Sequence, residues 1–363
     1  MKYNEIAFCG YYGNLNSGDD SFCAIAAWGA HKFWKIDDVT FLSKSVPILT
    51  KKATCIGTGV KSDFEYLIKL VRCVRNIPVL VYAGGSIFHG REGLNRKAID
   101  SFTSKKCIVG AIGVSIGPFK STKDERGVIN QLKKMSFLAL RDKDSYDYAK
   151  SLNINCTPVY AFDLAAFMPK IYGTIKQMKV NKPKLLGVIL CDTHGYGSET
   201  DNYINLVTAL NHIGKHHNVK ICFYIFNGNP ITGDTFITKR MARDLDKSIC
   251  FTIVNYCENP GVVFHAISQC DAVLSIRLHG GIFACLAKVP FILVEYHKKC
   301  TEFLNTINYN QKLRVGENLN SSDLENKLSM VLLNIEKCWS GDVESLIKIS
   351  EQNFECMHEL IFT

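Results

Sequence analysis

The sequence predicts an α/β fold of two Rossmann-like domains that face a cleft. Strand-length apolar segments alternate with helix-length segments, and this alternation occurs in two series separated by a stretch that contains prolines. Strands that alternate with helices predict a parallel sheet covered on both faces. A chain of 363 residues also exceeds the size of one ordinary hydrophobic core, which favours two domains.

The first series predicts an N-terminal domain over residues 1–170. Its helices are expected from about 18 to 35 and within 62–74, and its strands at 5–10, 39–43, 78–85, 105–118 and 135–142. The pattern lapses between 167 and 184, where Pro169 and Pro183 bracket a predicted linker.

The second series predicts a domain over residues 184–320. Strands are expected at 185–190, 219–227, 249–256, 271–276 and 290–296, with helices at about 200–215, 233–246, 260–269 and 280–288. Residues 321–363 predict two amphipathic helices, at 322–338 and 342–360, that could pack across both domains.

The composition excludes several classes of protein. A hydrophobic fraction of 47% with 21% charged residues is typical of a folded globular chain. No segment is long and apolar enough to span a bilayer, the N-terminus is unlike a secretory signal, and the fifteen cysteines form no regular framework, so we expect reduced thiols and a cytoplasmic location.

The formal charge of +9 favours anionic ligands or an anionic membrane surface. Peripheral association with the inner face of the membrane would fit this charge. The basic residues are dispersed and no nucleic-acid motif is present, so we expect no nucleic-acid partner. The sequence gives no indication of the oligomeric state.

Residues 275–296, SIRLHGGIFACLAKVPFILVEY, contain the strongest candidate site. A buried strand ends there at Arg277 and His279, and Gly280 and Gly281 are expected to turn the backbone tightly into a helix. Ligands of open α/β sheets usually bind at this edge. A functional role is favoured because no partner for a strand-end cation is visible in the sequence.

Two glycine-containing stretches follow strands in the first series. GYYGNLNSGDD (10–20) could bring backbone N–H groups to an anion, or could be a tight turn in which Asp19 or Asp20 caps the next helix. AGGSIFHG (83–90) offers a second glycine turn, and its His89 is either a general acid or a polar loop residue. The candidate binding residues here are Gly13, Asn14, Gly18, Asp19, Gly84, Gly85, Ser86 and His89.

Arg141 follows another apolar strand directly. Its guanidinium could bind a carboxylate or phosphate through two hydrogen bonds, which lysine cannot do. The alternative is a salt bridge to Asp142 or Asp144. Asp163 lies among apolar residues and is expected near the same edge.

A metal site is not expected. His212 and His216 have helical spacing, but no HExxH glutamate accompanies them, and Cys191 with His194 provides too few ligands. No C-x-x-C motif occurs in the sequence.

The sequence resembles the polysaccharide pyruvyl transferase family in stretches that follow one another between residues 10 and 304. They are GYYGNLNSGDD, AGGSIF, VSIGPF, LRDKDSYDYAK, FDLAA and SIRLHGGIFACLAKVPFILVEYHKKCTEFL. Ser86 stands where the family would have a third glycine, and FDLA replaces the more usual Asp-Pro. The resemblance implies a GT-B-like fold, phosphoenolpyruvate as donor and a sugar hydroxyl pair as acceptor, with no metal or redox cofactor.

The implied reaction moves the enolpyruvyl group of phosphoenolpyruvate onto a sugar of a cell-surface polysaccharide or its lipid-linked precursor. It forms a pyruvate ketal and releases phosphate. Arg277 and Arg141 would bind the donor, and His279 would be the general acid or a phosphate partner. Gly18, Asp19, Gly84, Gly85 and Ser86 would line the cleft on its N-terminal side, and Asp163 and Gly280 would also contact the substrate.

Two other functions compete with this reading. A GT-B-type glycosyltransferase would use the same basic strand ends to bind a nucleotide sugar, although no acidic ribose-binding residue is recognisable in the later loops of the second domain. A non-catalytic glycan-binding scaffold would keep the glycine loops and arginines without turnover.

Overall fold

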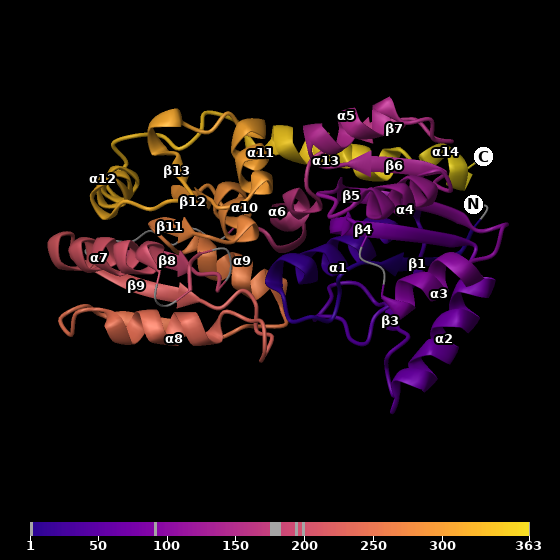
Figure 1. Ribbon diagram of the computed structural model, residues 1–363, viewed down its shortest axis with the longest axis horizontal. Helices are drawn as coiled ribbons and strands as arrows, with labels where there is room; N and C mark the ends of the chain where they lie inside the picture. Colours follow the sequence, from indigo (N-terminus) through magenta and orange to yellow (C-terminus); the bar gives the residue numbers. More distant parts are fainter. Residues whose placement is uncertain (1–2, 91–92, 175–182, 193–194, 198–199, 363) are drawn as a thin grey trace. The chain divides into compact units, whose positions relative to one another are not determined.

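The computed structural model describes residues 3–90, 93–174, 183–192, 195–197 and 200–362 (Figure 1). The chain divides into two compact units. The first comprises Met1–Gly13, Asp19–Phe167 and Glu344–Thr363, and the second comprises Asn14–Gly18 and Met168–Val343. Two segments therefore differ from the expected boundaries, because Asn14–Gly18 joins the second unit and the last twenty residues return to the first.

The first unit is built on a seven-stranded parallel sheet of order β3-β2-β1-β4-β5-β6-β7. The strands are β1 Glu5–Cys9, β2 Asp38–Phe41, β3 Thr54–Cys55, β4 Val79–Phe88, β5 Ile108–Ile116, β6 Phe137–Leu140 and β7 Pro158–Tyr160. β6 is buried along its whole length and β1 after its first residue, because helices cover both faces of the sheet.

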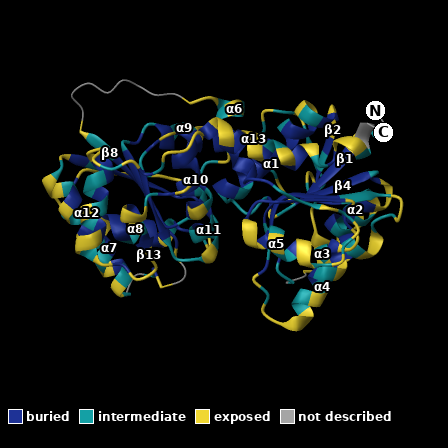
Figure 2. Ribbon diagram, turned by 90° about the horizontal axis from the view of Figure 1, so that it is seen from above, coloured by how far each residue is buried: buried dark blue, intermediate teal, exposed yellow. Residues whose placement is uncertain are grey.

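The helices of the first unit lie on two sides of its sheet (Figure 2). α2 Asp63–Asn76, α3 Leu94–Phe102, α4 Thr122–Leu132 and α5 Lys143–Ser151 cover one face, and α1 Ser17–Gly29 and α13 Val343–Glu355 cover the other. Three of these helices begin at side-chain caps, in which Ser62, Ser121 and Asp142 each accept a hydrogen bond from a backbone N–H three residues later.

The second unit has a six-stranded parallel sheet of order β10-β9-β8-β11-β12-β13. The strands are β8 Lys184–Ile189, β9 Val219–Tyr224, β10 Phe251–Val254, β11 Ala272–Ser275, β12 Phe291–Glu295 and β13 Val315–Gly316. Its helices are α6 Met168–Tyr172, α7 Asp201–His216, α8 Thr235–Asp244, α9 Pro260–Ser268, α10 Leu278–Leu286, α11 Lys298–Thr306 and α12 Ser321–Leu332. α7 packs against α12, and α9 packs against α10.

Several elements differ from the expectation. β3, β7 and β13 were not expected, because each is an edge strand of two or three residues, too short to carry an alternating pattern. The helix expected at 322–338 ends at Leu332, and the one expected at 342–360 is two helices, α13 and α14 (His358–Phe362). The expected linker contains helix α6, and residues 175–182 of it lie outside the described residues.

Each sheet reverses its strand order at one point. From β1 the chain moves outward to β2 and β3, and it then returns to β4 on the other side of β1. In the second unit the chain moves from β8 outward to β9 and β10, and it then returns to β11 on the other side of β8. Ligands of open α/β sheets bind beside the carboxyl ends of the strands at such switch points, which directs attention to the residues after β1, β4, β8 and β11.

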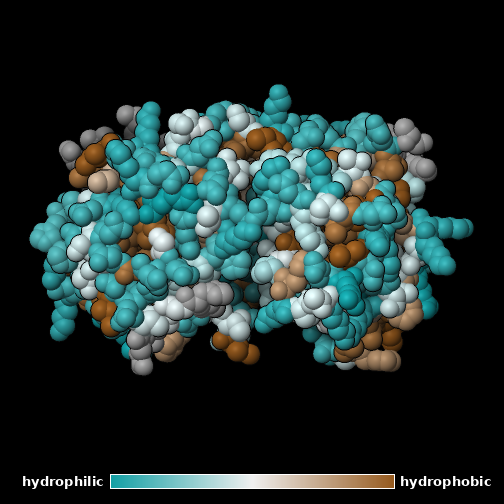
Figure 3. All heavy atoms as spheres, turned by 45° about the horizontal axis from the view of Figure 1, so that its top comes forward, coloured by the Kyte–Doolittle hydropathy of each residue, from teal (hydrophilic) through white to brown (hydrophobic). Residues whose placement is uncertain are grey.

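The face drawn in Figure 3 is mostly hydrophilic, and its apolar residues form small, separate areas. In the part of the chain that the structure describes, no helix combines the length and apolarity needed to cross a bilayer.

Candidate functional site

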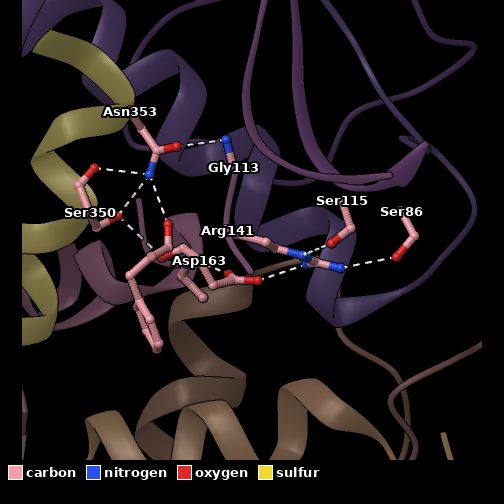
Figure 4. Close-up of polar contacts among 9 residues, drawn as sticks. Ser86, Gly113, Ser115, Arg141, Asp163, Ser350 and Asn353 are labelled. Atoms are coloured by element: carbon pink, nitrogen blue, oxygen red, sulfur yellow. Dashed lines mark hydrogen bonds and ion pairs between the residues drawn. The ribbon is translucent and has the colours of Figure 1, made fainter. Parts of the chain in front are cut away.

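Arg141, directly after β6, is the centre of a polar group at the carboxyl edge of the first sheet (Figure 4). Its Nε donates to Ser115 Oγ at 2.8 Å, its Nη1 to Asp163 Oδ2 at 2.7 Å and its Nη2 to Ser86 Oγ at 3.1 Å. These residues lie at or just after the ends of β4, β5, β6 and β7. The structure thus brings together Arg141, Asp163 and Ser86, all three of which the sequence indicated.

The salt bridge of Arg141 is not the one considered from the sequence. Asp142 caps α5, with its Oδ1 accepting from the Ser145 N–H at 2.8 Å, and the carboxylate that binds Arg141 is Asp163. The two side chains are only 6% and 5% exposed, so each charge needs the other. Arg141 is therefore held in one orientation by three partners.

Gly84 and Gly85 lie inside β4 rather than in a turn after it. Both have positive φ, +76° and +85°, and β4 shifts register against β5 just beyond them. A Cβ at Gly84 would lie 2.4 Å from the Phe22 ring, and one at Gly85 would lie 3.6 Å from Asp19 Oδ1. The glycines therefore let α1 approach β4 closely and place Asp19 beside that strand.

Gly13 and His89 lie farther out in the first unit. A Cβ at Gly13 would meet the Ser45 carbonyl oxygen at 2.8 Å, so this glycine packs against the loop after β2. His89 is half-buried in the bend after β4, beside Gly90, whose Cα approaches Asp124 of α4. His89 stays a separate candidate.

Arg277 forms the corresponding feature at the switch point of the second unit. Its Nε and Nη2 donate to Asp234 Oδ2 and Oδ1, each at 2.5 Å. Asp234, in the loop between β9 and α8, is fully buried, and its Oδ2 also accepts from the Asn227 N–H at 2.9 Å. The strand-end cation therefore has a carboxylate partner that the sequence analysis did not identify.

The electrostatics of this pair follow from its burial. Burial raises the pKa of Asp234, and the hydrogen bonds from Arg277 only partly oppose that shift. Burial acts to lower the pKa of Arg277, but the contact with Asp234 outweighs it, so the pKa lies above its usual range. Cys191, after β8, and Tyr296, after β12, are further electrostatic neighbours of Arg277.

His279 lies in the first turn of α10, a regular helix, whereas the tight turn expected at Gly280 and Gly281 would have placed it before the helix. A Cβ at Gly18 would lie 2.2 Å from His279 Nδ1, so the absence of a side chain there allows the imidazole to pack against the start of α1. The Gly18 N–H donates to Asn16 Oδ1 at 3.0 Å. Asn16, and not Asp19 or Asp20, is therefore the residue that caps α1.

The segment Asn14–Gly18 is attached to the end of β9. The Ser17 N–H donates to the Phe226 carbonyl at 2.9 Å, and the Gly228 N–H donates to the Leu15 carbonyl at 2.8 Å. Asn14 and Gly18, expected to act with the N-terminal domain, therefore belong with Arg277 and His279 in the second unit.

Gly280 and Gly281 do not form the expected tight turn. They are buried within α10, and a Cβ at Gly280 would lie 2.3 Å from Ser275 Oγ and 2.8 Å from Ile189 Cδ1. A Cβ at Gly281 would meet Leu293 at 3.1 Å. The glycine pair lets the helix lie directly on β8, β11 and β12, and the expected substrate contact of Gly280 stays a prediction.

The remaining histidines do not form a metal site in the described part of the chain. His212 Nδ1 lies 3.2 Å from Glu325 Oε2 of α12, and its ring centroid is 5.7 Å from that of His216. Over the described residues, no three His, Cys, Asp or Glu side chains are grouped to hold a metal ion. His194 lies outside the described residues.

Three residues of these sites were missed from the sequence. Asp234 directly precedes α8, at the start of the helix expected at 233–246, and no strand-end position singled it out. Ser115 lies within the stretch VSIGPF, which contributed only to the family resemblance. Asn353 lies 240 positions after Gly113, from whose backbone N–H it accepts a hydrogen bond, and no sequence pattern indicated this contact.

The sequence matches the family model of the polysaccharide pyruvyl transferases over residues 20–298. No curated protein matches it. Among solved structures, a putative UDP-N-acetylglucosamine 2-epimerase from Listeria monocytogenes has a TM-score of 0.64 at 9% identity, covering 96% of this chain and 94% of that one. The UDP-GlcNAc 2-epimerase from Methanocaldococcus jannaschii has a TM-score of 0.61 at 14% identity, covering 95% and 98%. At such low identity these likenesses show the fold alone, and they confirm the GT-B-like class.

Proposed function

Because the chain belongs to the polysaccharide pyruvyl transferase family, we propose that it transfers the pyruvyl group of phosphoenolpyruvate to two hydroxyls of a sugar. The products are a cyclic pyruvate ketal and inorganic phosphate. The observation that carries this proposal is Arg277, fixed by Asp234 at the switch point of the second sheet and followed by His279.

Arg277 has the features of an anion-binding group. Asp234 occupies Nε and one hydrogen of Nη2, and no described residue is seen to accept from the Nη1 hydrogens or the second Nη2 hydrogen, which we propose meet a donor oxygen. Arg277 also occupies the N-cap position of α10 without a side-chain capping bond, and the backbone N–H groups at the start of a helix favour negative charge. A phosphate or carboxylate would be stabilised by both contributions.

Arg141 offers a second anion-binding group in the first unit. Ser115, Asp163 and Ser86 each engage one of its nitrogens, so its guanidinium plane is fixed before any ligand arrives. Phosphoenolpyruvate carries both a phosphate and a carboxylate. We assign one arginine to each anionic end of the donor.

The chemistry balances without a redox step. A proton added to C3 of phosphoenolpyruvate leaves an oxocarbenium-like centre at C2, and one sugar hydroxyl attacks that carbon. The C2–O bond to phosphate then breaks, and a second hydroxyl closes the ketal. Of the two protons that the hydroxyls lose, one replaces the proton delivered to C3 and the other leaves on phosphate. We assign delivery of the C3 proton, or binding of the phosphate, to His279.

The acceptor in this proposal is a sugar of a cell-surface polysaccharide or of its lipid-linked precursor. With a lipid-linked acceptor, the transfer would take place at the cytoplasmic face of a membrane. The net charge of +9 would favour binding of the protein to an anionic lipid surface. This location and the lipid carrier belong to the proposal.

The test measures phosphate release from phosphoenolpyruvate with acceptors that contain galactose, glucose or mannosamine. Mass spectrometry of the acceptor should show the gain of one pyruvate less one water. Parallel reactions with UDP-sugars serve as the control, and transfer of a sugar in them without ketal formation would overturn the proposal. Activity should persist in excess chelator, and activity lost there but restored by a stoichiometric divalent ion would refute the metal-free mechanism.

A further inference from the structure

Asn353, on helix α13, joins two segments of the first unit that lie far from it in sequence (Figure 4). Its Oδ1 accepts from the Gly113 N–H at 2.6 Å, and its Nδ2 donates to the Phe162 carbonyl at 2.8 Å and the Ser350 carbonyl at 2.9 Å. The side chain is fully buried. One amide therefore holds β5 and the segment after β7 together.

Both of these segments lead to partners of Arg141. Gly113 lies two residues before Ser115, at the place where β5 shifts register against β6. Phe162 directly precedes Asp163, whose carbonyl also accepts from Ser350 Oγ at 3.2 Å. One segment offers a backbone N–H, at Gly113, and the other offers a backbone carbonyl, at Phe162. A side chain that bonds to both must accept and donate, as the amide of Asn353 does.

We propose that Asn353 is a positioning residue for Arg141. It fixes the backbone that presents Ser115 Oγ and the Asp163 carboxylate, and these two groups set the plane of the guanidinium. In this proposal α13 covers the sheet and also supports the residues that bind the donor. The effect on donor binding rests on the proposed function, whereas the coupling between Asn353 and Arg141 does not.

A second contact of the same helix provides a matched control. Trp34 Nε1 donates to the carbonyl of Phe354, the residue next to Asn353, at 2.8 Å. Trp34→Phe removes this buried hydrogen bond but leaves every partner of Arg141 in place. Asn353→Ala and Trp34→Phe should both lower the melting temperature of the full-length chain, because each leaves buried polar groups without a partner.

The experiment is a double-mutant cycle on phosphoenolpyruvate affinity. Calorimetric titration would compare Asn353→Ala and Trp34→Phe, each in the wild-type background and in Arg141→Lys. We expect Asn353→Ala to weaken binding about tenfold in the wild-type background and less than about twofold beside Arg141→Lys. Trp34→Phe should change affinity less than about twofold in either background. If Asn353→Ala fails to fold, Ser350→Ala makes the same comparison, because it removes the hydrogen bond to Asp163.

Two results would overturn the inference: a loss of affinity from Asn353→Ala that is equal in both backgrounds, or one that Trp34→Phe reproduces. If the wild-type chain does not bind phosphoenolpyruvate, or if Arg141→Lys binds it normally, the proposed role of Arg141 fails. In that case the melting temperatures of Asn353→Ala, Arg141→Lys and the double variant test the coupling between Asn353 and Arg141. Losses in melting temperature that are less than additive would support it, and additive losses would refute it.

Discussion

Asp234 accepts hydrogen bonds from both Nε and Nη2 of Arg277, so a fully buried carboxylate fixes the plane of a strand-end guanidinium. The side chain of Arg277 is itself 17% exposed. The buried aspartate holds the arginine in place while part of the arginine side chain stays exposed.

Arg277→Lys is expected to lower kcat/KM for phosphoenolpyruvate by about tenfold to a hundredfold, because lysine keeps the charge but loses the paired hydrogen bonds. Arg314→Lys is the matched control. Arg314 makes the same two-point contact with Glu295, at 2.7 and 2.5 Å, and is also 17% exposed, but it lies at β12 and β13. Near-normal kinetics of Arg277→Lys, or an equal loss in both variants, would remove Arg277 from the donor site.

The Asp234 carboxyl should produce an acidic limb in donor binding. Burial raises its pKa, so it takes up a proton at a higher pH than an exposed carboxylate would, and the pairing with Arg277 is then lost. KM for phosphoenolpyruvate should therefore rise as the pH falls through this raised pKa. Asp234→Asn should lack that limb, and an identical limb in the variant would show that another group causes it.

The contribution of Asp234 to stability has the opposite dependence on pH. The folded chain holds this proton more tightly than the unfolded chain, so the contribution is complete below the unfolded pKa and is lost as the pH rises through the folded pKa. Melting curves of the wild-type chain and Asp234→Asn over the same pH range check this sign.

The sequence predicted the interior strands and the edge of the sheet at which the candidate residues lie. Interior strands such as β8 and β11 are buried on both faces, so their apolar runs were visible, whereas an edge strand such as β13 carries no such run. Arg141 and Arg277 could be placed because each directly follows an apolar strand. Strand ends are fixed by local sequence, and the sheet brings them together.

The partners of these residues were less predictable. Asp163 was expected near the same sheet edge as Arg141 because it lies among apolar residues, although β7, the strand that it follows, was not expected. Asp234 comes from a loop whose path depends on tertiary packing. The pair Gly280–Gly281 was misinterpreted because glycine serves both tight turns and close helix packing, and only the neighbours of the Cα atoms distinguish the two.

Gly18→Ala tests the contact between α1 and His279. The new Cβ would lie 2.2 Å from His279 Nδ1, so the imidazole must move, and we expect turnover to fall by about a hundredfold. Gly127→Ala in α4 is the control, because a Cβ there meets nothing within 4 Å. Both variants should melt close to the wild-type temperature. Normal turnover of Gly18→Ala would show that the position of His279 does not matter to the reaction.

His279→Gln tests the proton donor itself. The residue is half-buried in the first turn of α10, two positions after Arg277, so both can act on one ligand. Glutamine keeps a hydrogen-bonding amide of similar reach but cannot deliver a proton at neutral pH. We therefore expect the variant to fold, to bind phosphoenolpyruvate with nearly normal affinity in calorimetric titration, and to lose about a hundredfold or more in turnover. If turnover instead survives while donor affinity falls, His279 binds the phosphate and the acid lies elsewhere, with His89 the next residue to replace.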